Sequence, residues 1–206
     1  MCADWAISSA RSCSRRSRAD EHRACARPRI AELLVTISGL PGAGTSTVAQ
    51  LVADALGLER VDGGTVFRSM AAEVGLDVGE FSKVAEGNPE IDLELDQRLA
   101  DRVKEGEVVL ESRLAGWIVT IEQLAAVRVW IDAEEAERAR RVAGREQEGQ
   151  DAALVANRAR EASERRRYRT YYGIDLDDLT VYDLVIDSTS TPPEAIAKSI
   201  LEAATR

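Results

Sequence analysis

The fold can be predicted outward from one stretch of the chain, Gly39-Leu40-Pro41-Gly42-Ala43-Gly44-Thr45-Ser46-Thr47. An apolar run at 33–37 precedes it and has the pattern of a buried strand. Apolar residues at three- and four-residue spacing follow it over 48–56, which predicts a helix with one buried face. A glycine-rich turn between a strand and a helix presents backbone N–H groups and a helix N-terminus to an anion. We therefore expect a phosphate-binding loop here.

This loop follows the nucleotide-binding pattern G-x-x-x-x-G-K-[ST] at Gly39, Gly44 and Ser46. All nine residues of 39–47 are predicted to contact the donor nucleotide, with Ser46 placed to hold Mg²⁺. The departure is Thr45, which stands where the pattern has the lysine that reaches the β- and γ-phosphates. Either the chain binds a triphosphate weakly, or arginines elsewhere supply the missing charge. A glycine-rich turn with no ligand is the structural alternative.

The remaining elements alternate between strand and helix patterns. Further strands are predicted at Val61, 107–110, 127–131 and 184–186, and helices at 66–74, 80–85, 89–103, 133–145, 151–172 and from 192 onward. Strands separated by helices form βαβ units and hence a parallel sheet that is covered on both faces. We expect an α/β protein of the P-loop NTPase fold, with a five-stranded parallel sheet and one domain over 30–206.

Composition limits the classes of function that fit the chain. Of 206 residues 45% are hydrophobic, so a folded core is expected, and the formal net charge is −9. Residues 1–29 carry seven arginines against three acidic residues and contain all three cysteines, so they form a basic leader that we expect to be disordered. The acidic remainder argues against binding nucleic acid, and its lack of cysteine excludes a disulfide framework. No run of 18 apolar residues occurs, so no membrane partner is expected.

Arginines supply nearly all the fixed positive charge, 24 of the 27 basic residues. Arg68 follows a glycine pair, and Arg113 follows the third strand. Two helices carry further sets at helical spacing, namely Arg138, Arg141 and Arg145 on the first and Arg160 and Arg167 on the second. A solvated, ion-paired surface is the alternative. Beside a loop that lacks its lysine, however, the pattern favours binding of a donor and an acceptor phosphate, because phosphoryl transfer depends on charge neutralisation.

Other polar residues are less informative. Asp92 and Asp96 lie one turn apart on a predicted helix and either read a base or sugar or form a solvated face. The one histidine, His22, lies in the leader, so catalysis by a Ser/His/Asp or Cys/His arrangement is excluded from the body of the chain.

Several longer blocks resemble the cytidylate kinase family in its short form, which is common in archaea. The resemblance covers about 33–190, and the blocks that carry it are 39–47, Val66-Phe67-Arg68, 80–83, 88–92, Glu111-Ser112-Arg113-Leu114-Ala115-Gly116-Trp117, 167–168, 172–175, 177–179 and 182–186. The resemblance implies transfer of the γ-phosphate of ATP to CMP or dCMP with Mg²⁺. In the short form a threonine at the lysine position is common, so Thr45 is a family trait. Other P-loop small-molecule kinases and a non-catalytic nucleotide-binding regulator remain alternatives.

The resemblance also implies roles for individual residues. Arg68, Arg113, Arg160 and Arg167 would hold the acceptor phosphate in a segment at about 65–105 and on the second arginine-rich helix, with Arg113 away from the phosphate loop. Arg138, Arg141 and Arg145 would belong to a lid at about 138–160 that closes over ATP. With Arg160 and Arg167 they form the predicted catalytic set, and Asp92 and Asp96 join the predicted acceptor site. We expect a cytoplasmic monomer.

Overall fold

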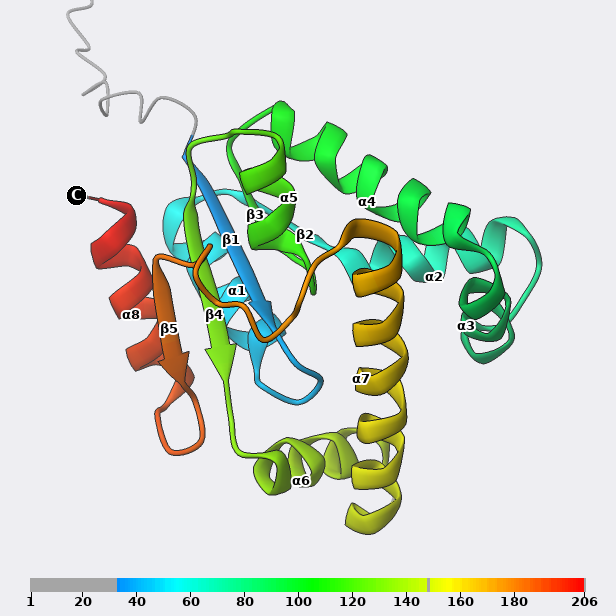
Figure 1. Cartoon of the computed structure of the whole chain (residues 1–206). Coiled ribbons are helices and arrows are strands. Elements are labelled where there is room, and N and C mark those ends of the chain that lie inside the picture. The colour runs from blue at the N-terminus through cyan, green and yellow to red at the C-terminus, as the bar shows by residue number, and fades with distance from the viewer. Residues whose placement is uncertain (1–32, 148, 206) are drawn as a thin grey trace, which may run out of the picture. The chain divides into compact units, whose positions relative to one another are not determined.

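The computed structural model describes residues 33–147 and 149–205 (Figure 1). It confirms the five-stranded sheet, in which all paired strands are parallel and the order is β2-β3-β1-β4-β5. The strands are β1 (Leu34–Gly39), β2 (Glu59–Asp62), β3 (Val108–Glu111), β4 (Val127–Asp132) and β5 (Leu184–Asp187). The leader (residues 1–29), and with it the prediction of its disorder, lies outside the described residues.

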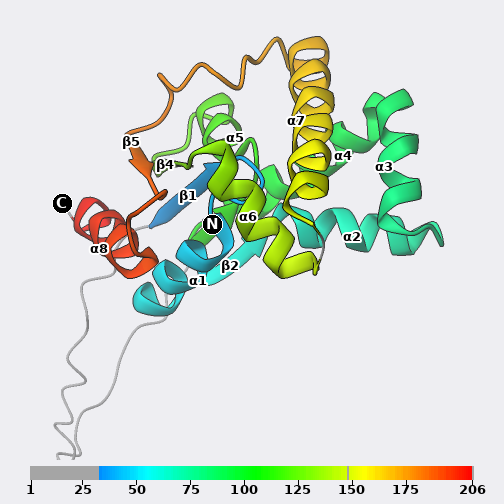
Figure 2. The same cartoon turned by 90° about the horizontal axis from the view of Figure 1, so that it is seen from below.

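Helices cover both faces of the sheet, as predicted. Those described are α1 (Thr45–Leu56), α2 (Gly63–Glu73), α3 (Val78–Gly87), α4 (Pro89–Lys104), α5 (Ala115–Ile121), α6 (Glu135–Glu146), α7 (Gln150–Tyr172) and α8 (Pro193–Ala204). Figure 2 shows α1 and α8 on one side of the strands and α5 on the other. The core is divided accordingly, because α1 and α8 pack with one set of strand side chains while α4 and α5 pack with the other.

The short helix α5 was not predicted. It has only seven residues, and its N-cap, Leu114, makes no side-chain capping bond. Four of the seven residues are buried against the sheet. Tertiary packing therefore stabilises this helix, and the local sequence carries too few turns to show a helical period.

Helices α2, α3 and α4 form a small cluster beside the sheet, in the region predicted to bind the acceptor. Met70, Phe81 and Ile91 contribute one buried side chain from each helix. Side-chain caps stabilise the starts of α3 and α4. Asp77 and Glu80 form a capping box at the start of α3, and Asn88 caps α4 ahead of Pro89.

The carboxyl ends of the strands gather at one edge of the sheet. The register pairs Ile37 and Asp62 with Glu111, and Asp132 with Asp187. Ligands of open parallel α/β sheets bind at this edge, where β1 leads directly into the predicted phosphate loop. Among the helices in the described ranges, none has the length and hydrophobicity that crossing a membrane requires.

Candidate active site

The predicted phosphate loop connects β1 to α1 in a conformation that requires glycine. Gly42 and Gly44 have φ angles of 85° and 90°, and Gly44 is the N-cap of α1. The Ala43 N–H donates to the Leu40 carbonyl oxygen at 3.0 Å, which closes the turn. A Cβ atom at Gly42 would lie 2.4 Å from the carbonyl oxygen of Arg138. The backbone of the loop therefore touches the first turns of α6.

Three arginines donate hydrogen bonds to carbonyl oxygens of this loop. Arg113 donates to Gly39, and Arg138 donates to Pro41 at 3.3 Å. Arg141 donates to Gly42 and Ala43 at 3.4 Å each. Positive charge thus lies against the carbonyl side of a loop that has a threonine in place of its lysine. We call Arg113, Arg138 and Arg141 the loop arginines.

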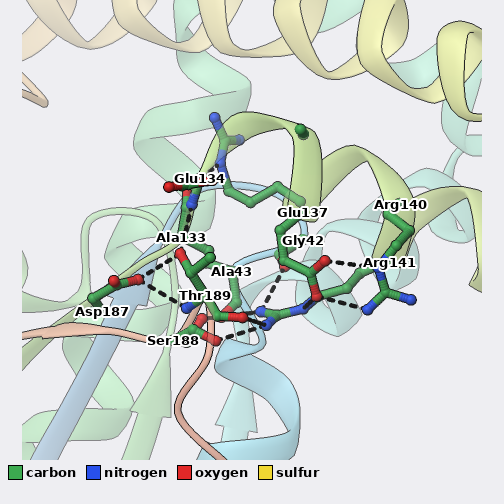
Figure 3. A network of polar contacts seen from close by, with 12 residues as sticks. Gly42, Ala43, Ala133, Glu134, Glu137, Arg140, Arg141, Asp187, Ser188 and Thr189 are labelled. Atoms are coloured by element: carbon green, nitrogen blue, oxygen red, sulfur yellow. Dashed lines mark hydrogen bonds and ion pairs between the residues drawn. The ribbon is translucent and has the colours of Figure 1, made fainter.

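Arg141 also joins the loop to the end of β5 (Figure 3). Its guanidinium donates to the hydroxyl of Ser188 at 2.9 Å and to the Ser188 carbonyl at 2.7 Å. The Ser188 hydroxyl in turn donates to the Ala43 carbonyl at 2.7 Å. On the other side Arg141 pairs with Glu137, and hydrogen bonds from Arg140 and Arg141 hold the pKa of Glu137 at about 2. Contacts on two sides therefore fix the Arg141 side chain at the loop.

A carboxylate at the end of β3 faces the start of α1. Glu111 Oε1 accepts hydrogen bonds from the hydroxyls of Thr45 at 2.7 Å and Ser46 at 2.6 Å. Its Oε2 pairs with Arg60 at 2.6 Å. Glu111 stands in one of the family blocks, but the sequence alone predicted no role for it. The sequence signal that could have indicated a role for Glu111 was its acidic side chain at the end of β3, the strand that pairs with β1.

Arg113 connects the loop to α7, which corrects the expectation that it lies away from the loop. Its Nε donates to Glu164 at 2.7 Å, while its Nη1 donates to Gly39. Arg160 pairs with the other oxygen of Glu164 at 2.9 Å. Burial alone would raise the pKa of Glu164, but the charges of Arg113 and Arg160 outweigh it and hold that pKa at about 2. Glu164 is a second site residue that sequence analysis left unassigned.

A second buried cluster joins α7 to α4 and contains Arg167, Asp92 and Asp96, three residues of the predicted acceptor site. Arg167 Nη1 lies 2.5 Å from both carboxylate oxygens of Asp92. The Tyr172 hydroxyl donates to Asp96 at 2.6 Å. Burial raises the pKa of Asp96 to about 6, and the charge of Asp92 adds to the effect. Arg167 Nε is buried without a hydrogen-bond partner among the described residues.

Two other predicted arginines are not brought into these clusters. Arg68 is exposed and contacts Asp62 and Thr65 near the start of α2. Arg145 is exposed and pairs with Glu146. Arg138 and Arg145, at helical spacing on α6, differ widely in exposure: the Arg138 side chain is 6% exposed and that of Arg145 is 65% exposed.

Comparison with known proteins identifies the family. Residues 34–190 match the profile of the cytidylate kinase-like family. The chain belongs to that family. A cytidylate kinase of Halobacterium salinarum is 45% identical over 172 residues, covering 83% of this chain and 88% of that protein. A cytidylate kinase of Methanocaldococcus jannaschii is 45% identical over 165 residues, covering 80% of this chain and 93% of that protein. The family resemblance seen in the sequence is thus confirmed.

Solved structures share the fold at low sequence identity. Shikimate kinase from Acinetobacter baumannii aligns with a TM-score of 0.57 and 16% identity, covering 85% of this chain and 94% of that one. A gluconokinase from Sinorhizobium meliloti aligns with a TM-score of 0.56 and 14% identity. The alignment covers 85% of this chain and 93% of that one. These similarities support the P-loop kinase fold alone.

Two of the cavities in the described part of the chain lie near these elements. One of about 190 Å³ adjoins the phosphate loop, between Gly44, Arg141, Ser188 and the start of α8. A larger one of about 310 Å³ lies among α2, α3 and α4, and none of the predicted phosphate-binding residues lines it. Of the two, the smaller cavity is therefore the one that adjoins the predicted phosphate loop.

Proposed function

We propose that this chain transfers the γ-phosphoryl group of ATP to CMP or dCMP. A phosphate oxygen of the acceptor forms the new bond to the γ-phosphorus, the bond to the β,γ-bridging oxygen breaks, and ADP leaves with that oxygen. One observation carries the proposal beyond family membership. Arg113 contacts the phosphate loop at Gly39 and, through Glu164, the helix that carries Arg160 and Arg167. The Arg113 guanidinium therefore contacts both the proposed donor loop and the helix of the proposed acceptor cluster.

On the donor side, backbone groups of the loop 39–47 and the N-terminus of α1 would hold the phosphates of ATP. The cavity of about 190 Å³ beside Arg141 is the proposed site of the donor nucleoside. The loop arginines would strengthen the positive field of the loop from its carbonyl side, which offsets the missing lysine at position 45. Arg145, exposed near the end of α6, would contact ATP only after the segment 138–160 closes.

Ser46 and Glu111 are the proposed residues at the Mg²⁺ position. Their side chains fit such an ion, since both are oxygen donors and the Glu111 carboxylate already lies 2.6 Å from the Ser46 hydroxyl. Mg²⁺ in phosphoryl transfer keeps several ligands from water and phosphate. The lack of a cluster of three or more His, Cys, Asp or Glu side chains within 33–147 and 149–205 therefore fits this arrangement. When bound, the ion would neutralise charge that develops on the β- and γ-phosphates.

On the acceptor side, Arg113, Arg160 and Arg167 would bind the CMP phosphate, joined by Arg68 when α2 moves towards it. The unpartnered Nε of Arg167 is the donor that supports this assignment most directly. Asp92 and Asp96 lie on the same cluster and would accept hydrogen bonds from the base or sugar. No side chain is required as a nucleophile, because the acceptor phosphate itself attacks.

We further propose that the enzyme acts as a cytoplasmic monomer without nucleic-acid or membrane partners. The acidic composition supports the part of this proposal that concerns nucleic acid, because phosphate backbones bind to basic surfaces.

The proposed function is tested by ADP release with a panel of acceptors. The native chain is supplied with ATP, Mg²⁺ and either CMP, dCMP, UMP or AMP, and ADP formation is coupled to NADH oxidation. We expect turnover with CMP or dCMP to exceed turnover with AMP by at least about tenfold in kcat/KM. Preference for AMP, or ATP hydrolysis that does not depend on an acceptor, would contradict the proposal.

A further inference from the structure

Helix α7 is linked to the phosphate loop through two arginines, each of which pairs with a glutamate of the helix. Glu161 and Glu164 lie three residues apart on α7, on one face of the helix. Glu164 pairs with Arg113, which donates to Gly39. Glu161 pairs with Arg138, which donates to Pro41. Each glutamate of this face therefore pairs with an arginine that also donates to a carbonyl oxygen of the loop.

The same helix carries the proposed acceptor arginines. Arg160 lies beside Glu161 in the sequence, and Arg167 pairs with Asp92 of α4. Figure 1 shows α7 running from α6 at one end to the region of α4 at the other. A change at the acceptor cluster thus acts on a helix that Arg113 and Arg138 link to the donor loop.

Arg138 has the contacts of a positioning residue. Its side chain is 6% exposed, its Nε donates to the Ala133 carbonyl at 3.1 Å, and its Nη1 is shared by Pro41 and Glu161. The Arg138 backbone leaves no space for a Cβ at Gly42. A guanidinium used in this way joins the loop to α7.

We propose that the Glu161–Arg138 pair couples the two substrate sites, so that binding of the acceptor tightens binding of ATP. The inference rests on the proposed function, because it takes CMP as the acceptor. Buried ion pairs tolerate little displacement, since an unpaired buried charge is strongly unfavourable. Ordering of α7 by CMP would therefore order the loop. Linkage requires the effect to be reciprocal, so ATP must tighten CMP binding by the same factor.

The chain offers a matched control. Glu135 and Arg158 also join α6 to α7 through an ion pair, with an N–O distance of 2.6 Å. Both side chains are exposed, and neither bonds to the loop. Loss of this pair removes a charged contact between the same two helices without removing a contact to the phosphate loop.

The test measures the coupling by calorimetry, with the full chain and Mg²⁺ throughout. The dissociation constant of the non-hydrolysable ATP analogue AMP-PNP is determined without CMP and with saturating CMP, for the native chain, Glu161→Gln and Glu135→Gln. We expect CMP to tighten AMP-PNP binding at least about fivefold in the native chain and in Glu135→Gln, and less than about twofold in Glu161→Gln. Reverse titrations, CMP into the AMP-PNP complex, should give the same ratios.

The quantity compared is the ratio of the AMP-PNP dissociation constants without and with CMP. Three outcomes would overturn the inference: a ratio of one in the native chain, the native ratio in Glu161→Gln, or a ratio lowered equally in Glu135→Gln and Glu161→Gln. If Glu161→Gln shows no cooperative thermal unfolding, Arg138→Lys replaces it, because an ammonium lacks the planar fork that reaches both Pro41 and Glu161. The same loss of coupling is expected there, and a native ratio in that variant overturns the inference. Failure of the native chain to bind CMP at all overturns the proposed function together with this inference, whereas CMP binding without coupling overturns the inference alone.

Discussion

Ser46 and Glu111 are joined by a hydrogen bond of 2.6 Å between the serine hydroxyl and the glutamate Oε1. Thr45, the residue in the lysine position, donates a hydrogen bond to the same oxygen. Arg60 pairs with the second oxygen of Glu111. Both oxygens of the carboxylate are therefore fixed at the first turn of α1, where the proposed Mg²⁺ position lies.

Replacement of Glu111 by glutamine tests this arrangement. The amide keeps the size of the side chain but removes its charge, so we expect a requirement for at least about tenfold more Mg²⁺ and a fall in kcat of about 10²-fold, equivalent to about 2.7 kcal/mol. ADP release is measured against Mg²⁺ concentration at fixed ATP. Glu59→Gln, on the neighbouring strand β2 and exposed, is the control and should behave as the native chain. An unchanged Mg²⁺ requirement in Glu111→Gln would remove Glu111 from the metal position.

Replacement of Arg113 by alanine should affect both substrates. Contact with Glu164 predicts a loss in kcat/KM for CMP of about 10²-fold, and contact with Gly39 predicts weaker ATP binding as well. The sequence alone placed Arg113 away from the phosphate loop, and from that position little change in ATP affinity would be expected. Steady-state kinetics with each substrate varied in turn separate the two effects. A change confined to the CMP constants would show that the Gly39 contact has no role in donor binding.

Asp96 should make the free energy of unfolding depend on pH. Its pKa is raised to about 6 by burial and by Asp92, against the lowering effects of Tyr172 and Arg167, so the folded state binds its proton more tightly than the unfolded state does. The group therefore destabilises the fold above about pH 6, and this penalty declines as the pH falls through that value. Between pH 7 and pH 5 the native chain should gain about 1 kcal/mol from this group.

Urea unfolding at pH 7 and pH 5, with native chain and Asp96→Asn compared, isolates this contribution. The variant should lack the gain. The range stays above the region in which Glu164 acts with opposite sign, since the stabilisation from its lowered pKa is lost only as the pH falls from about 4.5 towards 2. Equal pH dependence in the two proteins would mean that Asp96 titrates normally.

The order of strands and helices was predictable because its signals are local. The strand before Gly39, the glycine turn and the apolar stripe of α1 occupy one continuous stretch, and the caps at Asp77 and Asn88 mark helix starts within a few residues. Helix α5 was not predictable in this way, because its burial depends on the sheet against which it packs.

The roles of single side chains depended on contacts far apart in the sequence. Glu111 meets Ser46 because β3 pairs with β1, and that strand order is not written in any one segment. Spacing placed Arg138, Arg141 and Arg145 on one side of α6 but gave no sign that the loop would pack against its first turns. Resemblance to a family supplied the substrate class, whereas the three-dimensional contacts distinguish Arg138 from Arg145.

The loop arginines should make activity independent of a lysine at position 45. If Arg141 compensates for that lysine, Arg141→Ala should lower kcat more than tenfold in the native chain and less in the Thr45→Lys background. The two substitutions should then be non-additive in a double-mutant cycle, because they affect one shared charge. Strict additivity would mean that the two positions do not share this role.

The most direct test is the kcat/KM for CMP of the native chain and of Thr45→Lys, determined in one ADP-release assay with Mg²⁺ and ATP. We expect the native chain to be active with Thr45 in place and the lysine to change kcat/KM by less than about tenfold, under about 1.4 kcal/mol. A native chain without CMP-dependent ADP release, together with activity that appears only in Thr45→Lys, would contradict this expectation.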